Sequence, residues 1–171
     1  DFTIRAKIKP SSLATDGEIF CISIATQALD NFNVVFEYKT TGAIRFSIQT
    51  GSGGGVNADI SSTTGVIVAG TAYDVEACAD GSTARIYVDG VQVASGAITG
   101  TRANSRVSTR IGMLSVDTGY PRYVNGRVDN LIVYAGVCLH TGGTTFTPDS
   151  AITSLAIPRF TSRFTAAGTN D

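Results

Sequence analysis

The chain has 171 residues, with 13 lysines and arginines against 14 aspartates and glutamates, so its formal net charge is −1. This balance excludes a nucleic-acid-binding protein that relies on a basic surface. A hydrophobic content of 43% with only 16% charged residues excludes a disordered chain. No apolar run approaches the ~20 residues that a membrane-spanning helix needs. The length fits one domain, and the 19 glycines with many threonines, serines and valines favour an all-β fold.

Alternating hydrophobicity predicts strands along most of the first 135 residues. In the first strand, Phe2, Ile4, Ala6 and Ile8 share one face and polar residues lie between them. Further strands are expected at 18–26, 32–39, 43–50, 73–79, 84–88, 91–95, 110–112 and 123–134. The dipeptide Asp89-Gly90 predicts a two-residue hairpin turn with left-handed backbone angles. About ten to twelve strands at this spacing, with no predicted helix or repeat, indicate an antiparallel β-sandwich.

The end of the chain follows a weaker pattern. In the predicted strand 123–134, the residues Val128, Asn130, Ile132 and Tyr134 would share a face. Beyond Pro148 the alternation fades, so we divide the chain into a sandwich at 1–150 and an arm or tail at 151–171. We expect the arm to pack on the sandwich or on a neighbouring subunit through four apolar residues: Leu155, Ile157, Phe160 and Phe164. Because the sequence starts at Asp1 within a strand pattern, we expect a processed chain or a piece of a longer one.

The three cysteines are Cys21, Cys78 and Cys138, an odd number that leaves at least one unpaired within the chain. None has CxxC spacing, which argues against zinc or redox chemistry. We expect small buried side chains, in keeping with assembly in a reducing compartment.

Four successive segments resemble the laminin-G-like, concanavalin A-like jelly rolls. The first strand, FTIRAKIKP at Phe2–Pro10, is similar to the FTIEAWIKP strand of that family. Three later motifs match in order: TAYDV at 71–75, ARIYVDGV at 84–91 and YVNGRVDNL at 123–131. The resemblance covers most of 2–148 and implies an antiparallel jelly-roll β-sandwich. Ala72 stands where the family usually has tryptophan, and the strand that usually precedes the first motif is missing.

A further stretch, DNLIVYAGV at 129–137 with FTP at 146–148, resembles the end of such jelly rolls in tailed-bacteriophage virion proteins. Leu139-His140 departs from that pattern, which usually has Arg-Tyr. The resemblance implies a non-enzymatic module on the virion surface, such as a tail fibre, spike or head decoration. Its partners would be other virion subunits, including copies of itself, and host-cell glycans. The alternative is a secreted or cell-surface adhesion module that binds polysaccharide with calcium.

Catalytic motifs are weak. Glu18, Glu37 and Glu76 lie on separate predicted strands, each flanked by apolar residues, and we expect surface carboxylates rather than a glycosidase pair. The single histidine, His140, follows a strand, where we expect a solvated loop side chain. No GxSxG elbow is present, and the glycine-rich 51–55 lacks the GK[ST] of a phosphate-binding loop. We therefore expect no enzyme, and a glycan-cleaving activity ranks third.

The candidate glycan site is the stretch 115–123, in which Tyr120 and Tyr123 would stack on a sugar and Asp117 and Arg122 would hold its hydroxyls. The alternative is an ordinary loop with Tyr123 half-buried. The spaced arginines Arg102, Arg106 and Arg110 fit either a subunit contact or scattered surface charge.

Calcium is the only cofactor that we consider, because jelly rolls of this family often hold it at the sandwich rim. The candidates by chain region are Asp117, Asn125, Asp129 and Asn130, of which none is assigned as a ligand. Asp129 also fits a structural role as an acceptor of turn hydrogen bonds.

Overall fold

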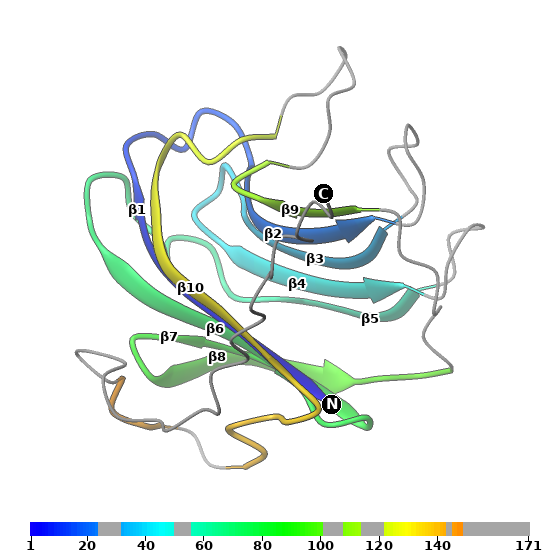
Figure 1. The fold of residues 1–171 in the computed structure, drawn as a ribbon. Helices are drawn as coiled ribbons and strands as arrows, with labels where there is room; N and C mark the ends of the chain where they lie inside the picture. The colour runs from blue at the N-terminus through cyan, green and yellow to red at the C-terminus, as the bar shows by residue number, and fades with distance from the viewer. Residues whose placement is uncertain (24–31, 50–55, 101–107, 114–121, 143–144, 149–171) are drawn as a thin grey trace, which may run out of the picture.

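The computed structural model describes residues 1–23, 32–49, 56–100, 108–113, 122–142 and 145–148 (Figure 1). They form ten strands: β1 (Phe2–Pro10), β2 (Gly17–Ser23), β3 (Phe32–Tyr38), β4 (Ile44–Gln49), β5 (Val56–Ser61), β6 (Tyr73–Ala79), β7 (Thr83–Val88), β8 (Val91–Ala97), β9 (Ser108–Ile111) and β10 (Gly126–Ala135). The described residues contain no helix that could cross a membrane.

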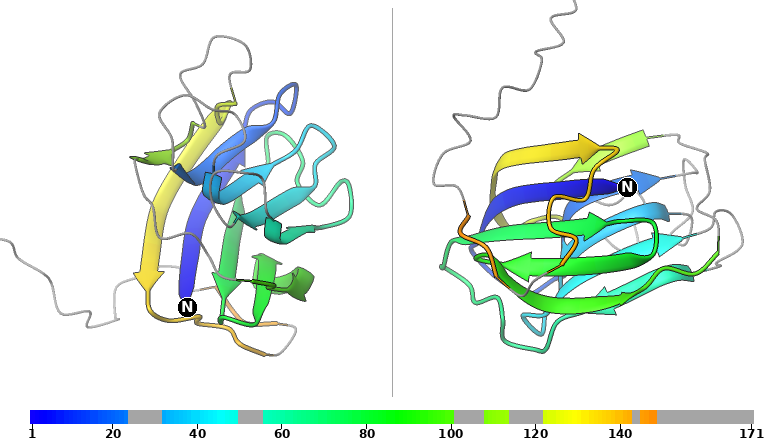
Figure 2. Two further views of the ribbon diagram at one scale, coloured as in Figure 1. Left: turned by 90° about the vertical axis from the view of Figure 1, so that its right-hand side faces the viewer. Right: turned by 90° about the horizontal axis from the view of Figure 1, so that it is seen from below.

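The strands form two antiparallel five-stranded sheets that face each other (Figure 2). Sheet A has the order β10-β1-β6-β7-β8, and sheet B has the order β5-β4-β3-β2-β9. The edge strands β9 and β10 lie on one side of the sandwich, and β5 and β8 lie on the other (Figure 2). The expected antiparallel all-β sandwich is therefore confirmed, and the pattern missed only β5 among these strands.

The core follows from the alternation of apolar residues. Phe2, Ile4, Ala6 and Ile8 of β1 are all buried between the sheets, as predicted. Opposite them, the apolar residues of β3 and β4 include Phe36 and Phe46, whose rings meet edge to face at 6.1 Å. Aromatic pairs in this geometry add to the free energy gained from burial.

The predicted face of β10 is wrong beyond its first residues. Asn130 has a φ of +48°, and the pairing of β1 with β10 shifts between Arg5 and Lys7. This β-bulge adds one residue to β10 and reverses the alternation after it. As a result, Val128 and Val133 both face the core, opposite Ile8 and Ile4.

The Asp89-Gly90 turn is confirmed, with φ of +50° and +78° at its two residues. The chain that follows β10, at 137–142 and 145–148, crosses the outer face of sheet A, and we call it the strap. The strap is bonded at both ends: Thr3 Oγ1 donates to Val137 O at 3.0 Å, and Phe146 N donates to Gly90 O at 2.7 Å.

The cysteine expectation is corrected in part. Cys78 of β6 and Cys138 of the strap form a disulfide, with their Cα atoms 5.3 Å apart. Cys21 is the free cysteine among the described residues, and it is buried. Because two of the three cysteines are paired, cysteine usage no longer supports the hypothesis that the protein assembles in a reducing compartment.

The expectation for the three glutamates is wrong, because Glu18, Glu37 and Glu76 are all buried. Glu18 and Glu37 lie on the outer face of sheet B, and Glu76 lies beneath the strap. The alternation predicted an outward Glu37, whereas Glu18 turns outward only because the strand bulges between Glu18 and Phe20. It did not predict that these sheet faces are covered. The arm residues Leu155, Ile157, Phe160 and Phe164 lie outside the described residues, so the division at 150 stays a prediction.

Candidate functional site

A row of charged side chains crosses the outer face of sheet B. In the register of the sheet, Glu18 of β2 lies opposite Glu37 of β3, and Glu37 lies opposite Arg45 of β4. Directly opposite residues on one face have Cβ atoms about 5 Å apart, so these side chains meet. Asp59 of β5 extends the row toward the far edge of the sheet.

Glu37 is the centre of this row. Its Oε1 accepts hydrogen bonds from Arg45 Nη1 at 2.7 Å and Lys39 Nζ at 3.3 Å. Its Oε2 accepts one from Arg122 Nη1 at 3.4 Å. Because the Glu37 carboxylate is fully buried, these three cations replace the water that it loses on folding.

Arg45 is held from two sides. Besides Glu37, it contacts Asp59 through a two-bond fork, from Nε to Oδ1 at 2.7 Å and from Nη2 to Oδ2 at 2.8 Å. Lys39 likewise pairs with Asp16 as well as Glu37. The row therefore presents part-exposed arginine, lysine and aspartate groups in fixed positions around one buried carboxylate.

Glu18 differs from its neighbour. It is fully buried, and neither carboxyl oxygen has a hydrogen-bond partner in the described structure. Burial first, and then repulsion from Glu37, raise the pKa of Glu18 well above its usual range. The two neighbours thus differ: the pKa of Glu18 is raised and its carboxyl group lacks a hydrogen-bond partner, whereas Glu37 is ion-paired with three cations.

Of the four predicted glycan residues, the structure describes two, and it brings one of them, Arg122, into the charged row. Arg122 bonds to Glu37, and Tyr123 bridges to Met113 next to β9 with 49% of its surface exposed. Asp117 and Tyr120 lie outside the described residues. Sequence reasoning missed Glu37, Arg45 and Asp59. In the sequence, these residues are visible only as one charged residue at an outward position of each of three successive strands. The strand register is needed to show that they lie next to one another.

Of the spaced arginines, Arg110 lies on β9 opposite Cys21. Arg102 and Arg106 lie outside the described residues.

Of the four calcium candidates, Asp117 lies outside the described residues, and the other three lie at the start of β10 and within it. Asp129 Oδ1 accepts a hydrogen bond from Asn130 N at 2.8 Å, the structural role considered from the sequence. Asn125 N donates to the Tyr38 hydroxyl at 3.1 Å. Within the described ranges there is no group of three or more histidine, cysteine, aspartate or glutamate side chains that could hold a metal ion.

His140 is not a solvated loop side chain. Its Nδ1 lies 2.6 Å from Oε1 of the buried Glu76, and its ring stacks on Phe146 at 3.6 Å between centroids. Burial raises the pKa of Glu76, and the bond to His140 opposes that rise. Since these groups hold the strap on sheet A, the outer face of sheet A is an internal contact of the protein.

The described residues form a two-layer antiparallel β-sandwich that carries the strap on the outer face of sheet A and the charged row on that of sheet B. The chain is a member of the Concanavalin A-like lectin/glucanases superfamily, since the Laminin_G_3 family of that description matches residues 1–140. The resemblance to laminin-G-like jelly rolls is therefore confirmed.

Solved structures agree on the fold. The CBM40 of the Ruminococcus gnavus IT-sialidase, bound to alpha2,3 sialyllactose, has a TM-score of 0.64 at 13% identity and covers 78% of this chain and 74% of its own. The leech intramolecular trans-sialidase has the same TM-score at 14% identity, with 78% of this chain and 21% of its own covered. Domains LG4-5 of the mouse laminin alpha1 chain give 0.58 at 17% identity, with 77% and 34% covered. A search of curated protein sequences finds no match.

Proposed function

We propose that this chain is a non-enzymatic glycan-binding module and that it binds through the charged row on sheet B. The observation that carries the proposal is the contact of Arg122 with Glu37, in a row that also holds Arg45 and Asp59, with the exposed Tyr123 next to Arg122 in the sequence. Sugar recognition needs fixed donors and acceptors for hydroxyl groups beside an aromatic ring for a pyranose face. The rim of the row supplies these groups.

The fold likeness supports the same class. The similar structures include a CBM40 bound to a sialylated sugar, and the superfamily takes its name from lectins as well as glucanases. Sequence identities of 13–17% show a shared fold and nothing more, so experiment must decide which glycan this chain binds.

The geometry favours binding over hydrolysis. Glu18 and Glu37 are cross-strand neighbours on one face of sheet B, and glycosidases act with a pair of carboxyl groups. Both are buried, however, and Glu37 is held by three cations. A general acid or nucleophile must reach the glycosidic bond, which neither side chain does here.

For the setting in which the module works, we propose the surface of a virion, where it docks to other subunits and to copies of itself. The outer edges of β9 and β10, which no described strand pairs with, carry the exposed Ile111 and Val133 and support subunit docking. The alternative setting is a secreted or cell-surface adhesion module. Recovery of the chain within purified phage particles would support the first setting, and recovery on bacterial cells would support the second.

The deciding experiment for glycan binding is an array screen of the purified chain, with calcium and with a chelator. We expect saturable binding to one glycan class, which Arg122→Ala and Tyr123→Ala weaken at least tenfold. The control is Arg85→Ala, which removes an arginine paired with Asp80 on sheet A and should leave binding unchanged. The proposal would be refuted if the chain bound no glycan on the array, or if Arg85→Ala weakened binding as much as Arg122→Ala and Tyr123→Ala do. Loss of binding with the chelator would show that calcium participates.

A further inference from the structure

The charged row on sheet B carries no excess of positive charge among the residues that the structure describes. Its cations are all ion-paired with the buried Glu37: Lys39, Arg45 and Arg122. Asp16 is a second partner of Lys39, and its carboxylate compensates the same ammonium group. Asp59 is a second partner of Arg45. Three cations in the row are therefore matched by three carboxylates.

Arg45 is largely occupied by these carboxylates. A guanidinium group has five N–H groups, and three of those of Arg45 donate within the row. Nε and Nη2 donate to Asp59, and Nη1 donates to Glu37. The pair of parallel bonds through which an arginine binds a carboxylate or a sulfate is thus already made with Asp59. The N–H groups that remain on Arg45 are donors for single hydroxyl oxygens.

Asp59 supplies acceptors at the same place. Its side chain is 40% exposed, and each of its two oxygens accepts one hydrogen bond from Arg45. A carboxylate has about four acceptor positions in all, so Asp59 keeps free positions for further donors. A sugar hydroxyl both donates and accepts a hydrogen bond. Two neighbouring hydroxyls of one sugar therefore match the acceptors of Asp59 and the donors of Arg45.

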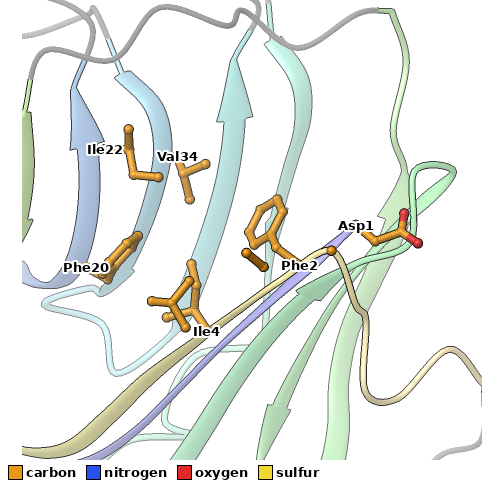
Figure 3. A pocket seen from close by; sticks show the side chains of 9 residues that line it. Asp1, Phe2, Ile4, Phe20, Ile22 and Val34 are labelled. Atoms are coloured by element: carbon orange, nitrogen blue, oxygen red, sulfur yellow. The ribbon is translucent and has the colours of Figure 1, made fainter. Parts of the chain in front are cut away.

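The cavities that the structure describes at one end of the sandwich do not offer such groups. One, of about 160 Å³, lies between β1 and β10 of sheet A and β2 and β3 of sheet B (Figure 3). The other, of about 350 Å³, shares Asp1 and Phe2 with it. Among the described residues that line either cavity, Asp1 has the only polar side chain. A sugar there would lose hydrogen bonds to water that these walls could not replace.

Resting on the proposed glycan binding at the charged row, we infer that the ligand is a neutral glycan held through two neighbouring hydroxyls by Asp59 and Arg45. An acidic sugar is disfavoured, because its negative charge would meet cations that already have counter-ions and would lie close to Asp59. Glu18 does not change this conclusion, since its ionisation would only add negative charge beside Glu37.

The first test compares neutral and acidic glycans on the array, with heparin as a soluble sulfated probe. We expect neutral glycans to bind and heparin not to bind. Raising NaCl from about 50 mM to about 500 mM should change the affinity for a neutral glycan by less than about twofold, because salt weakens chiefly the attraction between charges. Binding confined to acidic glycans, or an affinity that falls tenfold with salt, would overturn this inference and leave glycan binding itself standing. Binding of no glycan would overturn both proposals.

The second test is Asp59→Asn, which keeps the size of the side chain and removes its charge. We expect the affinity for the neutral glycan to fall at least tenfold, because the charged acceptor is lost and Arg45 is no longer held from two sides. The matched control is Asp74→Asn, which removes an aspartate paired with Lys7 on sheet A and should leave the affinity unchanged. If Asp59→Asn binds as the natural protein does while Arg122→Ala is weakened, glycan binding holds and the role given to Asp59 is wrong.

Discussion

At the scale of single residues, Glu37 decides how the outer face of sheet B is held together. Its buried carboxylate compensates Arg45, Lys39 and Arg122 at once. We expect Glu37→Gln to lower the free energy of unfolding by about 2–4 kcal/mol, because it leaves these cations without their shared anion. Urea denaturation at neutral pH measures the loss.

The matched control for Glu37 is Asp59→Asn, which removes the other carboxylate of Arg45. Because Asp59 is 40% exposed, water replaces much of the lost contact, and we expect a loss of less than about 1 kcal/mol. If both variants lose the same free energy of unfolding, burial does not strengthen the contribution of Glu37 to stability.

Glu18 gives a prediction about pH. Its pKa is raised in the folded protein by burial and by Glu37, so folding keeps a proton that the unfolded chain releases above about pH 4.5. Stability should therefore fall as the pH rises through and beyond that value, by about 1.4 kcal/mol for each unit by which the pKa is raised.

Glu18→Gln tests this directly, since glutamine has the shape of the neutral acid and cannot ionise. We expect the variant to match the natural protein near pH 4 and to be more stable than it at pH 8, by urea unfolding at both values. A stability difference that is constant with pH would show that Glu18 is not held in its neutral form.

At the scale of elements, the strap depends on the β7–β8 turn. Gly90 has a φ of +78°, and a Cβ there would lie 1.8 Å from Phe146 O. We expect Gly90→Ala to cost more than about 2 kcal/mol, because backbone strain adds to displacement of the strap. Gly70→Ala is the control, with a φ of +83° and open space around the added Cβ. Gly70→Ala should lower the free energy of unfolding by only about 1 kcal/mol, measured by thermal or urea unfolding. If Gly70→Ala lowers it as much as Gly90→Ala does, the contact of the turn with the strap does not contribute to stability.

The disulfide is the second anchor of the strap. Cys78 and Cys138 are 60 residues apart, and closing such a loop restricts the unfolded chain. We expect Cys138→Ser to lower the free energy of unfolding by roughly 2–4 kcal/mol. A reductant should lower the natural protein to the same level and leave Cys138→Ser unchanged. Cys21→Ala should keep its sensitivity to the reductant; if it does not, the pairing is wrong.

At the scale of the whole molecule, the two outer faces differ in what covers them. The strap closes the outer face of sheet A, while the rim of the charged row on sheet B is part-exposed. We expect a bound glycan to shift the NMR signals of Lys39, Arg45 and Tyr123 and to leave those of Lys7 and Arg85 unchanged. Shifts centred on Lys7 and Arg85 would place binding on the wrong sheet.

The sequence by itself determined the fold class and most strands, because the alternation in β1, β3 and β4 reports directly which side chains are buried between the sheets. It also determined the Asp89-Gly90 turn, whose left-handed angles depend on those two residues. Its assignment of Arg122 and Tyr123 to a glycan site stays a prediction, and it did not foresee the contact of Arg122 with Glu37.

Only the tertiary structure decided the rest. The bulge at Asn130 changes which residues of β10 face the core, and it arises from pairing with β1 rather than from local pattern. The burial of Glu76, the pairing of Cys78 with Cys138 and the ring stack of His140 depend on the strap, which joins residues about 60 positions apart. The charged row likewise depends on register, because Glu37, Arg45 and Asp59 meet only when three strands align. Local patterns report which side of a strand is apolar, and long-range pairing decides what covers the other side.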